Sequence, residues 1–278
     1  DGTLRTWDRT TGALLSTVRV DEQAVNSVAV SPDGERIATA GAEGLVGIRT
    51  RDGVELARLP GHAGFVLDVS FSPDGRQVVS SGKDGTIRIW DPGPDGARSL
   101  PATAAAYSPD GRRIVVGGAD GHVRVLEADG LQVQLDLPGH DGRSWPVFSA
   151  DGTRIASAGE DGTVRVWDAV DGHEIAVLRP HQDSSVWSVA FDPDGTRLVS
   201  GADDGTVVIS SLVGDAPLAL PRHDGPVNYV LFSPDGSTIA TAGRSGTIRR
   251  WRGGEELPPL VGHENGIRTL AFSTDGSL

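Results

Sequence analysis

Hydrophobic and polar side chains alternate in short runs between residues 62 and 103, which form one unit of the chain. Val66, Val69 and Phe71 are apolar at near-alternate positions, which predicts a β-strand with one irregular step. Residues 86–90 alternate without a break, so that the isoleucines face one side and Arg and Trp face the other. Two further strands are expected at residues 77–81 and 97–100.

The breaks between these runs carry residues that favour tight turns. In the phrase Ser72-Pro73-Asp74-Gly75, proline presets φ, aspartate bonds its own backbone and glycine accepts a positive φ. Asp84-Gly85 is a hairpin signal between the second and third runs. No helical periodicity lies between the runs, so the unit is predicted to be an antiparallel meander of four short strands.

The same turn phrase recurs seven times at nearly constant spacing. Its copies begin at Ser31, Ser72, Ser108, Ser149, Asp192, Ser233 and Ser273, so the steps are 41, 36, 41, 43, 41 and 40 residues. A second phrase keeps this period, as DGTLRTWD at 1–8, DGTIRIWD at 84–91 and DGTVRVWD at 161–168. Repeats of this length are supersecondary units that bury their faces only against neighbouring copies.

The other units follow the same plan as the first. In one of them, strands are expected at residues 186–192, 197–202, 206–212 and 216–220. A single sheet of this size is marginal by itself, whereas a ring of such sheets shares its apolar faces and leaves few open edges. We therefore expect one all-β domain over residues 1–278, in which seven four-stranded antiparallel sheets close into a ring.

Each end of the chain holds part of a unit. Residues 4–7 and 13–20 are expected to be a third and a fourth strand, and residues 267–273 a first strand. Together they would make one sheet shared between the N- and C-terminal segments. Its second strand would begin near Leu278, so we expect the closing sheet to lack one strand in this chain. Missing residues, a further repeat or a partner would supply that strand.

Composition narrows the environment and the partners. A formal net charge of −13 argues against nucleic acid and anionic membranes, which need a basic face. No apolar run approaches the 18 residues of a membrane span, and no signal peptide is present, so a cytoplasmic protein without membrane insertion is expected. Methionine is absent, the chain starts inside a repeat phrase, and Lys83 is the only lysine among 25 basic residues. We expect a segment of a longer bacterial protein, tethered to other domains.

The Trp-Asp dipeptide stands at Trp7-Asp8, Trp90-Asp91 and Trp167-Asp168, and a Gly-His pair stands at Gly61-His62, Gly139-His140 and Gly262-His263. With these phrases the whole chain resembles the WD-repeat β-propeller family. The resemblance implies a seven-bladed β-propeller of four-stranded antiparallel blades. It also implies a closing blade shared between the chain ends, as is usual in that family.

In that family a third-strand Trp, a second-strand Ser or Thr, a loop His and a turn Asp form a buried hydrogen-bonded set. The resemblance implies two complete sets here: His62, Ser80, Asp84 and Trp90, and His140, Ser157, Asp161 and Trp167. A third set would join His263 to Asp1 and Trp7 across the closure.

Other units are degraded, with Arg49 or Ser210 in the Trp place, Ser245 in the Asp place, or Val116 and Leu126 for polar partners. We expect these units to be held mostly by apolar packing and to be the softer part of the ring.

Partner contacts are expected at the loop-bearing end, because family members often bind through residues that flank the irregular step of each first strand. The corresponding positions are Asn26, Phe65, Leu67, Ser144, Ser185, Trp187, Pro226, Asn228 and Arg268. Exposed aromatic side chains and arginines are the residue types that dominate interface energetics. The alternative is that Phe65 and Trp187 only pack against neighbouring blades.

The histidines do not indicate catalysis. Five of the seven hold the same repeat position, which a single active site would not require: His62, His140, His181, His223 and His263. Gln77 stands where a phosphate-binding loop ending at Lys83 needs its first glycine. No dense set of oxygen ligands indicates calcium. We therefore expect no catalytic residue, no cofactor and no metal.

The predicted function is a non-enzymatic protein-interaction or sensing scaffold, a propeller domain of a larger bacterial signalling protein with protein partners. The net charge of −13 favours basic partners by steering. The alternative is a propeller enzyme, hydrolase-like, whose site lies at the central channel and would require convergent carboxylates or histidines there. A purely structural scaffold is a third hypothesis.

Overall fold

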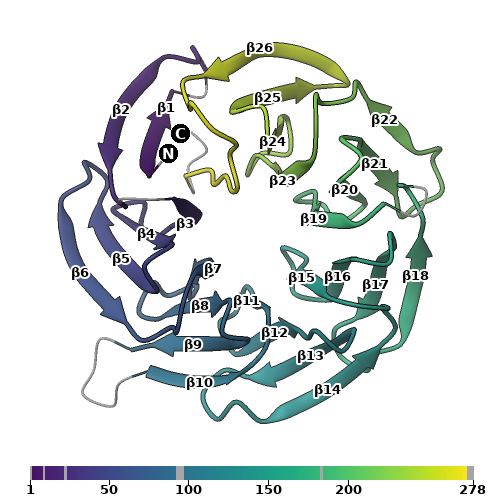
Figure 1. Ribbon diagram of the computed structural model, residues 1–278. Coiled ribbons are helices and arrows are strands. Elements are labelled where there is room, and N and C mark those ends of the chain that lie inside the picture. Colours follow the sequence, from purple (N-terminus) through teal and green to yellow (C-terminus); the bar gives the residue numbers. More distant parts are fainter. Residues whose placement is uncertain (1, 9, 22–23, 92–96, 182–183, 274–278) are drawn as a thin grey trace.

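A computed structural model describes residues 2–8, 10–21, 24–91, 97–181 and 184–273, and these residues form an all-β propeller. Figure 1 shows its sheets arranged as blades in a ring, with the first strand of each blade innermost and the last outermost. No helix in this part of the chain is long and apolar enough to cross a membrane.

Six blades each contain four antiparallel strands in sequence order. The first two are β3 (Val25–Val30), β4 (Arg36–Gly41), β5 (Leu45–Thr50), β6 (Glu55–Pro60), and β7 (Val66–Phe71), β8 (Val78–Gly82), β9 (Thr86–Trp90), β10 (Ala97–Pro101). The next two are β11 (Ala104–Tyr107), β12 (Arg113–Gly117), β13 (His122–Glu127), β14 (Val133–Pro138), and β15 (Ser144–Phe148), β16 (Arg154–Gly159), β17 (Val164–Asp168), β18 (Glu174–Leu178). The last two are β19 (Val186–Phe191), β20 (Arg197–Ala202), β21 (Val207–Ser211), β22 (Leu218–Leu220), and β23 (Val227–Phe232), β24 (Ile239–Gly243), β25 (Thr247–Arg252), β26 (Glu255–Val261).

The strands of the unit at 62–103 lie where the alternation predicted them, as β7 to β10. The predicted irregular step is a bulge: Val66 pairs with Gly82 and Asp68 with Ser81, so Leu67 has no partner of its own. Equivalent bulges leave Asn26, Trp187 and Asn228 unmatched in β3, β19 and β23. A bulge bends the strand and redirects its side chains. In contrast, β15 pairs with β16 without a bulge.

The turns also form as predicted. Gly75 and Gly85 adopt φ values of 69° and 74°, which a side chain would strain. The Ser72 hydroxyl donates to Asp74 at 2.6 Å and accepts the Gln77 amide at 2.9 Å, so the turn and the start of β8 are fixed together.

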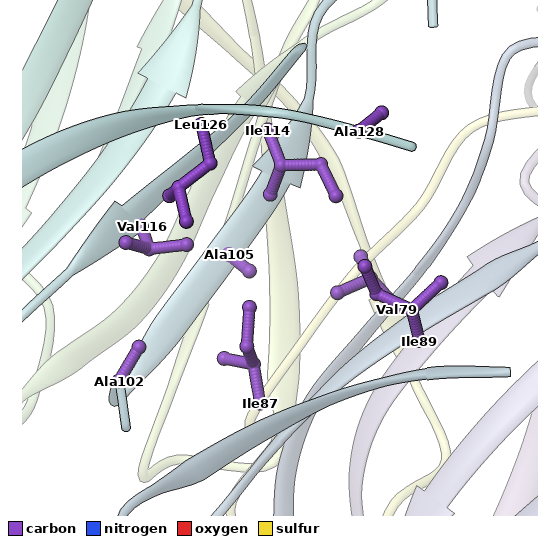
Figure 2. Packing of buried hydrophobic residues seen from close by; sticks show 9 residues of the cluster. All are labelled: Val79, Ile87, Ile89, Ala102, Ala105, Ile114, Val116, Leu126 and Ala128. Atoms are coloured by element: carbon purple, nitrogen blue, oxygen red, sulfur yellow. The ribbon is translucent and has the colours of Figure 1, made fainter. Parts of the chain in front are cut away.

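The hydrophobic core lies between blades rather than within them. One cluster joins Val79, Ile87 and Ile89 of one blade to Ile114 and Leu126 of the next, as Figure 2 shows. Each four-stranded sheet therefore lies between neighbouring sheets. This explains why the second strands are buried on both faces, as in β8 and β24, where every residue is buried.

Arginines at the start of second strands connect adjacent blades. Their contacts lie at the end of the ring that carries the turns between first and second strands. Arg36 donates to the Gly75 carbonyl at 3.0 Å and lies over the Phe71 ring at 5.5 Å. Arg113 repeats this arrangement, with a bond to Gly152 at 2.9 Å and a ring contact with Phe148 at 5.3 Å. A cation over an aromatic face adds attraction to each junction.

The predicted count of seven four-stranded blades is not met, because the described residues form six. The remaining sheet has two strands, β1 (Thr3–Trp7) and β2 (Leu14–Arg19), which were predicted as the third and fourth strands of the closing blade. Residues 267–273, predicted as its first strand, are not a strand. With no second strand described beside them, their backbone has no ladder partner. The expected start of that strand near Leu278 lies outside the described residues.

The C-terminal segment nevertheless packs where a closing blade belongs. Ile267, Leu270 and Phe272 share one apolar cluster with Trp7 of β1 and Ile248 of β25. The Asn228 side chain donates to the Ile267 carbonyl at 2.8 Å. In Figure 1 the segment after β26 returns to the inside of β1, between β23 and β3. The two ends of the described chain thus meet in one sector of the ring.

Candidate functional site

The first predicted set forms a continuous hydrogen-bonded chain. The Trp90 indole N–H donates to Ser80 Oγ at 2.7 Å, and Ser80 Oγ lies 2.9 Å from His62 Nε2. On the other side of the ring, His62 Nδ1 lies 3.1 Å from an oxygen of Asp84. With Nδ1–H donating to Asp84, Nε2 is free to accept the Ser80 hydroxyl proton. The set joins the loop before β7 to β8, to β9 and to the turn between them.

The second set repeats the histidine contacts of the first, two blades further along the chain. His140 Nε2 bonds to Ser157 Oγ, and His140 Nδ1 lies 3.0 Å from Asp161. Trp167 meets His140 edge to face, with ring centroids 6.0 Å apart. All three side chains of this central group, His140, Ser157 and Trp167, are buried.

A threonine outside the predicted members completes each set. Thr163 Oγ1 lies 3.0 Å from His140 Nδ1 and donates to Asp161 at 2.7 Å. Thr86 makes the equivalent bond to Asp84 at 2.8 Å. The signal was present in the sequence, because this threonine follows Asp-Gly in the recurring third-strand phrase.

Burial and hydrogen bonding act in opposite directions on these ionisable groups. Desolvation lowers the pKa of His140, although the Asp161 bond opposes it. Desolvation raises the pKa of Asp161, but hydrogen bonds from Thr163 and His140 outweigh it and lower the pKa to about 2. The set is thus a neutral histidine bonded to an ionised carboxylate, which is a structural arrangement in a closed interior.

Two degraded sets keep the histidine without a bonded carboxylate. His181 bonds to Thr206 and Ser200, each at 2.7 Å. His223 Nε2 lies 2.9 Å from Thr241, while its Nδ1 is buried with no hydrogen-bond partner among the described residues. Desolvation lowers the pKa of both histidines to about 4.

The other substitutions have different consequences. Arg49, in the Trp place, is buried and pairs with Glu55 at 2.9 Å. Val116 and Leu126 belong to the apolar cluster of Figure 2, so their blade replaces the polar set with packing.

The third predicted set is formed in part. Trp7 and His263 lie with ring centroids 5.6 Å apart, across the closure. Asp1, the remaining predicted member, lies outside the described residues.

The predicted partner-binding positions divide into exposed and buried groups. Phe65 and Leu67 are 41% and 38% exposed, Arg268 is exposed, and Trp187 is half-buried. Lys83 lies over the Phe65 ring at 5.5 Å. These side chains are accessible at the loop-bearing end.

The other predicted positions are less accessible, and three of them bond to neighbouring parts of the ring. Asn26 is buried and its side chain donates to the Val66 carbonyl of the next blade at 2.8 Å, as Asn228 does to Ile267. Ser144 is fully buried. Ser185 is half-buried and donates to the Glu160 carbonyl of the preceding blade. Sequence spacing locates the bulge, but it does not reveal whether a short polar side chain reaches the adjacent strand.

A cavity of about 790 Å³ opens between the first strands at this end. Its lining includes Trp145 and Trp187, whose rings meet edge to face with centroids 4.9 Å apart. The described lining contains one carboxylate, Asp68, and no histidine. Ser27 donates to Asp68, and burial raises the pKa of that carboxyl. The convergent carboxylates or histidines expected of a channel enzyme are therefore not found among these lining residues.

One group of potential metal ligands lies elsewhere, in the turn after β17. Ligand atoms of Asp168, Asp171 and His173 lie within 4.8 Å of one another. The Asp168 carboxylate accepts the Val170 amide at 2.7 Å, and Asp171 accepts the His173 amide at 3.0 Å. These bonds identify both aspartates as turn formers.

Comparison with known proteins agrees with this geometry. The family model described as "WD domain, G-beta repeat" matches residues 12–48, 53–91, 97–126, 131–168, 172–209 and 216–252. Over 93 residues the chain is 31% identical to the target of rapamycin complex subunit LST8 of Saccharomyces cerevisiae. That match covers 33% of this chain and 31% of the relative, so it spans about a third of each protein.

Proposed function

Because the chain belongs to the WD-repeat family, we propose that it is a non-enzymatic platform that binds other proteins. The observation that carries this proposal is the accessible apolar surface at the loop-bearing end, where Phe65 and Leu67 stand exposed beside the channel. Interfaces rely on a few such side chains around a desolvated centre. The relative LST8 is by its name a subunit of a protein complex, which supports an assembly role.

The proposed mechanism is a rigid, preformed surface. The contacting side chains stand on bulges and loops of strands that are locked between two neighbouring blades. A partner would then bind with little backbone rearrangement. The buried sets contribute by fixing the loops relative to the strands.

We propose further that the complete ring has seven blades, with β1, β2 and residues 267–273 in the closing one. A cavity of about 160 Å³ lined by β1, by Val28 and Ile37 of the next blade and by Phe272 supports this, because a second strand would fill that position. Of the 25 basic residues, 24 are arginine and only Lys83 is lysine, and this bias supports a bacterial source. A role as one domain of a larger signalling protein, in the cytoplasm, is part of the same proposal.

Partner capture tests the platform. Tagged wild-type protein and a Phe65→Ala/Trp187→Ala variant are expressed in the source organism, and co-purified proteins are quantified by mass spectrometry. Val170→Ala is the matched control, because Val170 is 77% exposed in a turn after β17, away from the channel. The control should retain the specific partners and the double variant should lose at least 80% of them while its melting temperature stays within a few degrees. Full retention by the folded double variant would refute the proposed face.

A further inference from the structure

The mouth of the central channel differs in charge from the rest of the molecule. The chain carries a formal net charge of −13. The described residues that line the 790 Å³ cavity include three arginines, Arg143, Arg244 and Arg268, and a single acidic residue, Asp68. Since burial raises the pKa of Asp68, its carboxyl offsets little of this positive charge. The channel mouth is therefore a basic site in an acidic protein.

Two of the three arginines are available to a ligand. Arg244 and Arg268 are exposed, and neither side chain has an ion pair or hydrogen bond with another described residue. Arg143 is partly occupied, because its Nε lies 4.0 Å from Glu160. An unpaired guanidinium offers two parallel N–H donors that match a carboxylate.

An aromatic surface lies in the same cavity. Trp145 and Trp187, from the neighbouring strands β15 and β19, are half-buried, and their rings are 4.9 Å apart. The Trp187 indole N–H is directed to Asp203, at 3.3 Å, so this ring is held in place. A fixed aromatic pair favours an apolar or aromatic side chain over an ion alone.

We propose that the channel mouth binds an acidic peptide segment of a partner protein, with carboxylates at Arg244 and Arg268 and an apolar side chain against the Trp145–Trp187 pair. This rests on the proposed platform function and names the partner class for its centre. It reverses, for the mouth alone, the expectation of basic partners drawn from net charge.

Charge around the mouth favours a short acidic peptide over nucleic acid. Asp141, Asp203 and Asp224 are exposed in the loops that flank the cavity. A nucleic acid carries a continuous row of phosphates and would meet these carboxylates beyond the arginines. A peptide with two or three acidic residues can place its charges at the arginines alone.

Fluorescence anisotropy tests the proposal with the full 278-residue chain. The probe is a fluorescein-labelled decapeptide with a central tryptophan flanked by aspartate and glutamate. One comparison peptide carries lysine at every acidic position, and another carries serine in place of tryptophan. A dT20 oligonucleotide represents nucleic acid. We expect the acidic tryptophan peptide to bind at least tenfold more tightly than any of the others, and to weaken at least fivefold from 50 to 500 mM NaCl.

Variants separate the site from general charge. Arg244→Glu/Arg268→Glu should weaken binding of the acidic peptide more than tenfold. Arg76→Glu/Arg112→Glu makes the same charge change in turns at the opposite end of the ring and should weaken it less than twofold. If the first pair does not fold, Arg244→Gln/Arg268→Gln replaces it. Equal binding by the two pairs, or preference for the lysine peptide or dT20, would overturn the proposal.

The outcome is separable from that of the platform function. If Phe65→Ala/Trp187→Ala loses its captured partners but the acidic peptide does not bind wild-type protein, the platform stands and the acidic-partner assignment fails. If partner capture is also unaffected, both fail.

Discussion

The blade formed by β15 to β18 and the blade formed by β11 to β14 solve the same packing problem with different chemistry. In the first, His140 bonds to Ser157 and to Asp161, so the loop, the second strand and the hairpin turn are linked. In the second, Val116 and Leu126 occupy the positions of the polar partners and pack in an apolar cluster. Both occupy equivalent places in the ring, so the fold requires a filled interior and not a particular set of bonds.

The difference teaches what the polar set adds. Apolar packing is non-directional and is satisfied by many arrangements, whereas a fully bonded set fixes one geometry. We therefore expect the blades to differ more in rigidity than in their contribution to overall stability.

The largest effect should come from removing the tryptophan of the bonded blade. Trp167→Ala leaves a large cavity and should cost on the order of 3–5 kcal/mol, which lowers the melting temperature by roughly 10 °C. Trp187 is half-buried at the channel mouth, so Trp187→Ala should cost less than about 1.5 kcal/mol. Thermal melts followed by circular dichroism measure both, and equal shifts would contradict the distinction between core and binding tryptophans.

Acidification should weaken the ring through the histidines that lack a bonded carboxylate. His181 and His223 titrate near 6.5 when unfolded, and burial lowers their folded pKa to about 4. Between these values the unfolded chain binds more protons, so the free energy of unfolding falls as the pH drops from 6.5 towards 4, by up to about 3 kcal/mol per histidine.

Urea denaturation at pH 7, 5.5 and 4.5 measures this loss. The fall in the free energy of unfolding should be absent above pH 7 and should approach its full size only near pH 4.5. Nuclear magnetic resonance titration of the histidine ring protons shows which histidines cause this loss of stability. A folded pKa near 6.5 for His223 would contradict the mechanism.

Removing a hydroxyl from the bonded blade, or adding one to the apolar blade, should give smaller effects. Ser157→Ala leaves His140 Nε2 buried without its partner and should cost about 1–3 kcal/mol. Val116→Thr introduces a hydroxyl that has no histidine to meet and should cost about 1–2 kcal/mol. If Val116→Thr stabilised the protein in denaturation experiments, the apolar blade would be an incomplete bonded set and not an alternative to it.

Restoring a lost partner should give the smallest effect, and it should be favourable. Ser245→Asp places a carboxylate at the hairpin position next to the unpaired His223 Nδ1, and should stabilise the protein by about 1 kcal/mol. The matched control, Asp161→Ser, makes the reverse change in a complete set and should destabilise it. A lower melting temperature for Ser245→Asp would show that this turn cannot reproduce the geometry of the complete blades.

Much of the fold was predictable because the repeat multiplies weak signals. One run of alternating residues is ambiguous, but the Ser-Pro-Asp-Gly turn and the Asp-Gly hairpin fixed the ends of β7, β8 and β9 to within about a residue. The bonded sets followed from the resemblance, and the structure places together the members of the His62 set and of the His140 set.

The errors lie where neighbours in space, and not in sequence, decide. The strand predicted at residues 267–273 needs a partner strand that is not described, and its alternation alone does not make it a strand. For Asn26, sequence spacing predicts a partner contact but does not reveal that its amide reaches the Val66 carbonyl of the next blade. The inter-blade arginines, such as Arg113, were missed because their partners lie a full repeat away.

Hydrogen exchange measured by mass spectrometry tests most directly the claim that the bonded sets rigidify their blades. Peptides covering β16 and β17 should exchange most slowly, and those covering β12 and β13 at least tenfold faster, although both pairs of strands are mostly buried. Equal protection in the two blades, or slower exchange in the apolar one, would contradict the account.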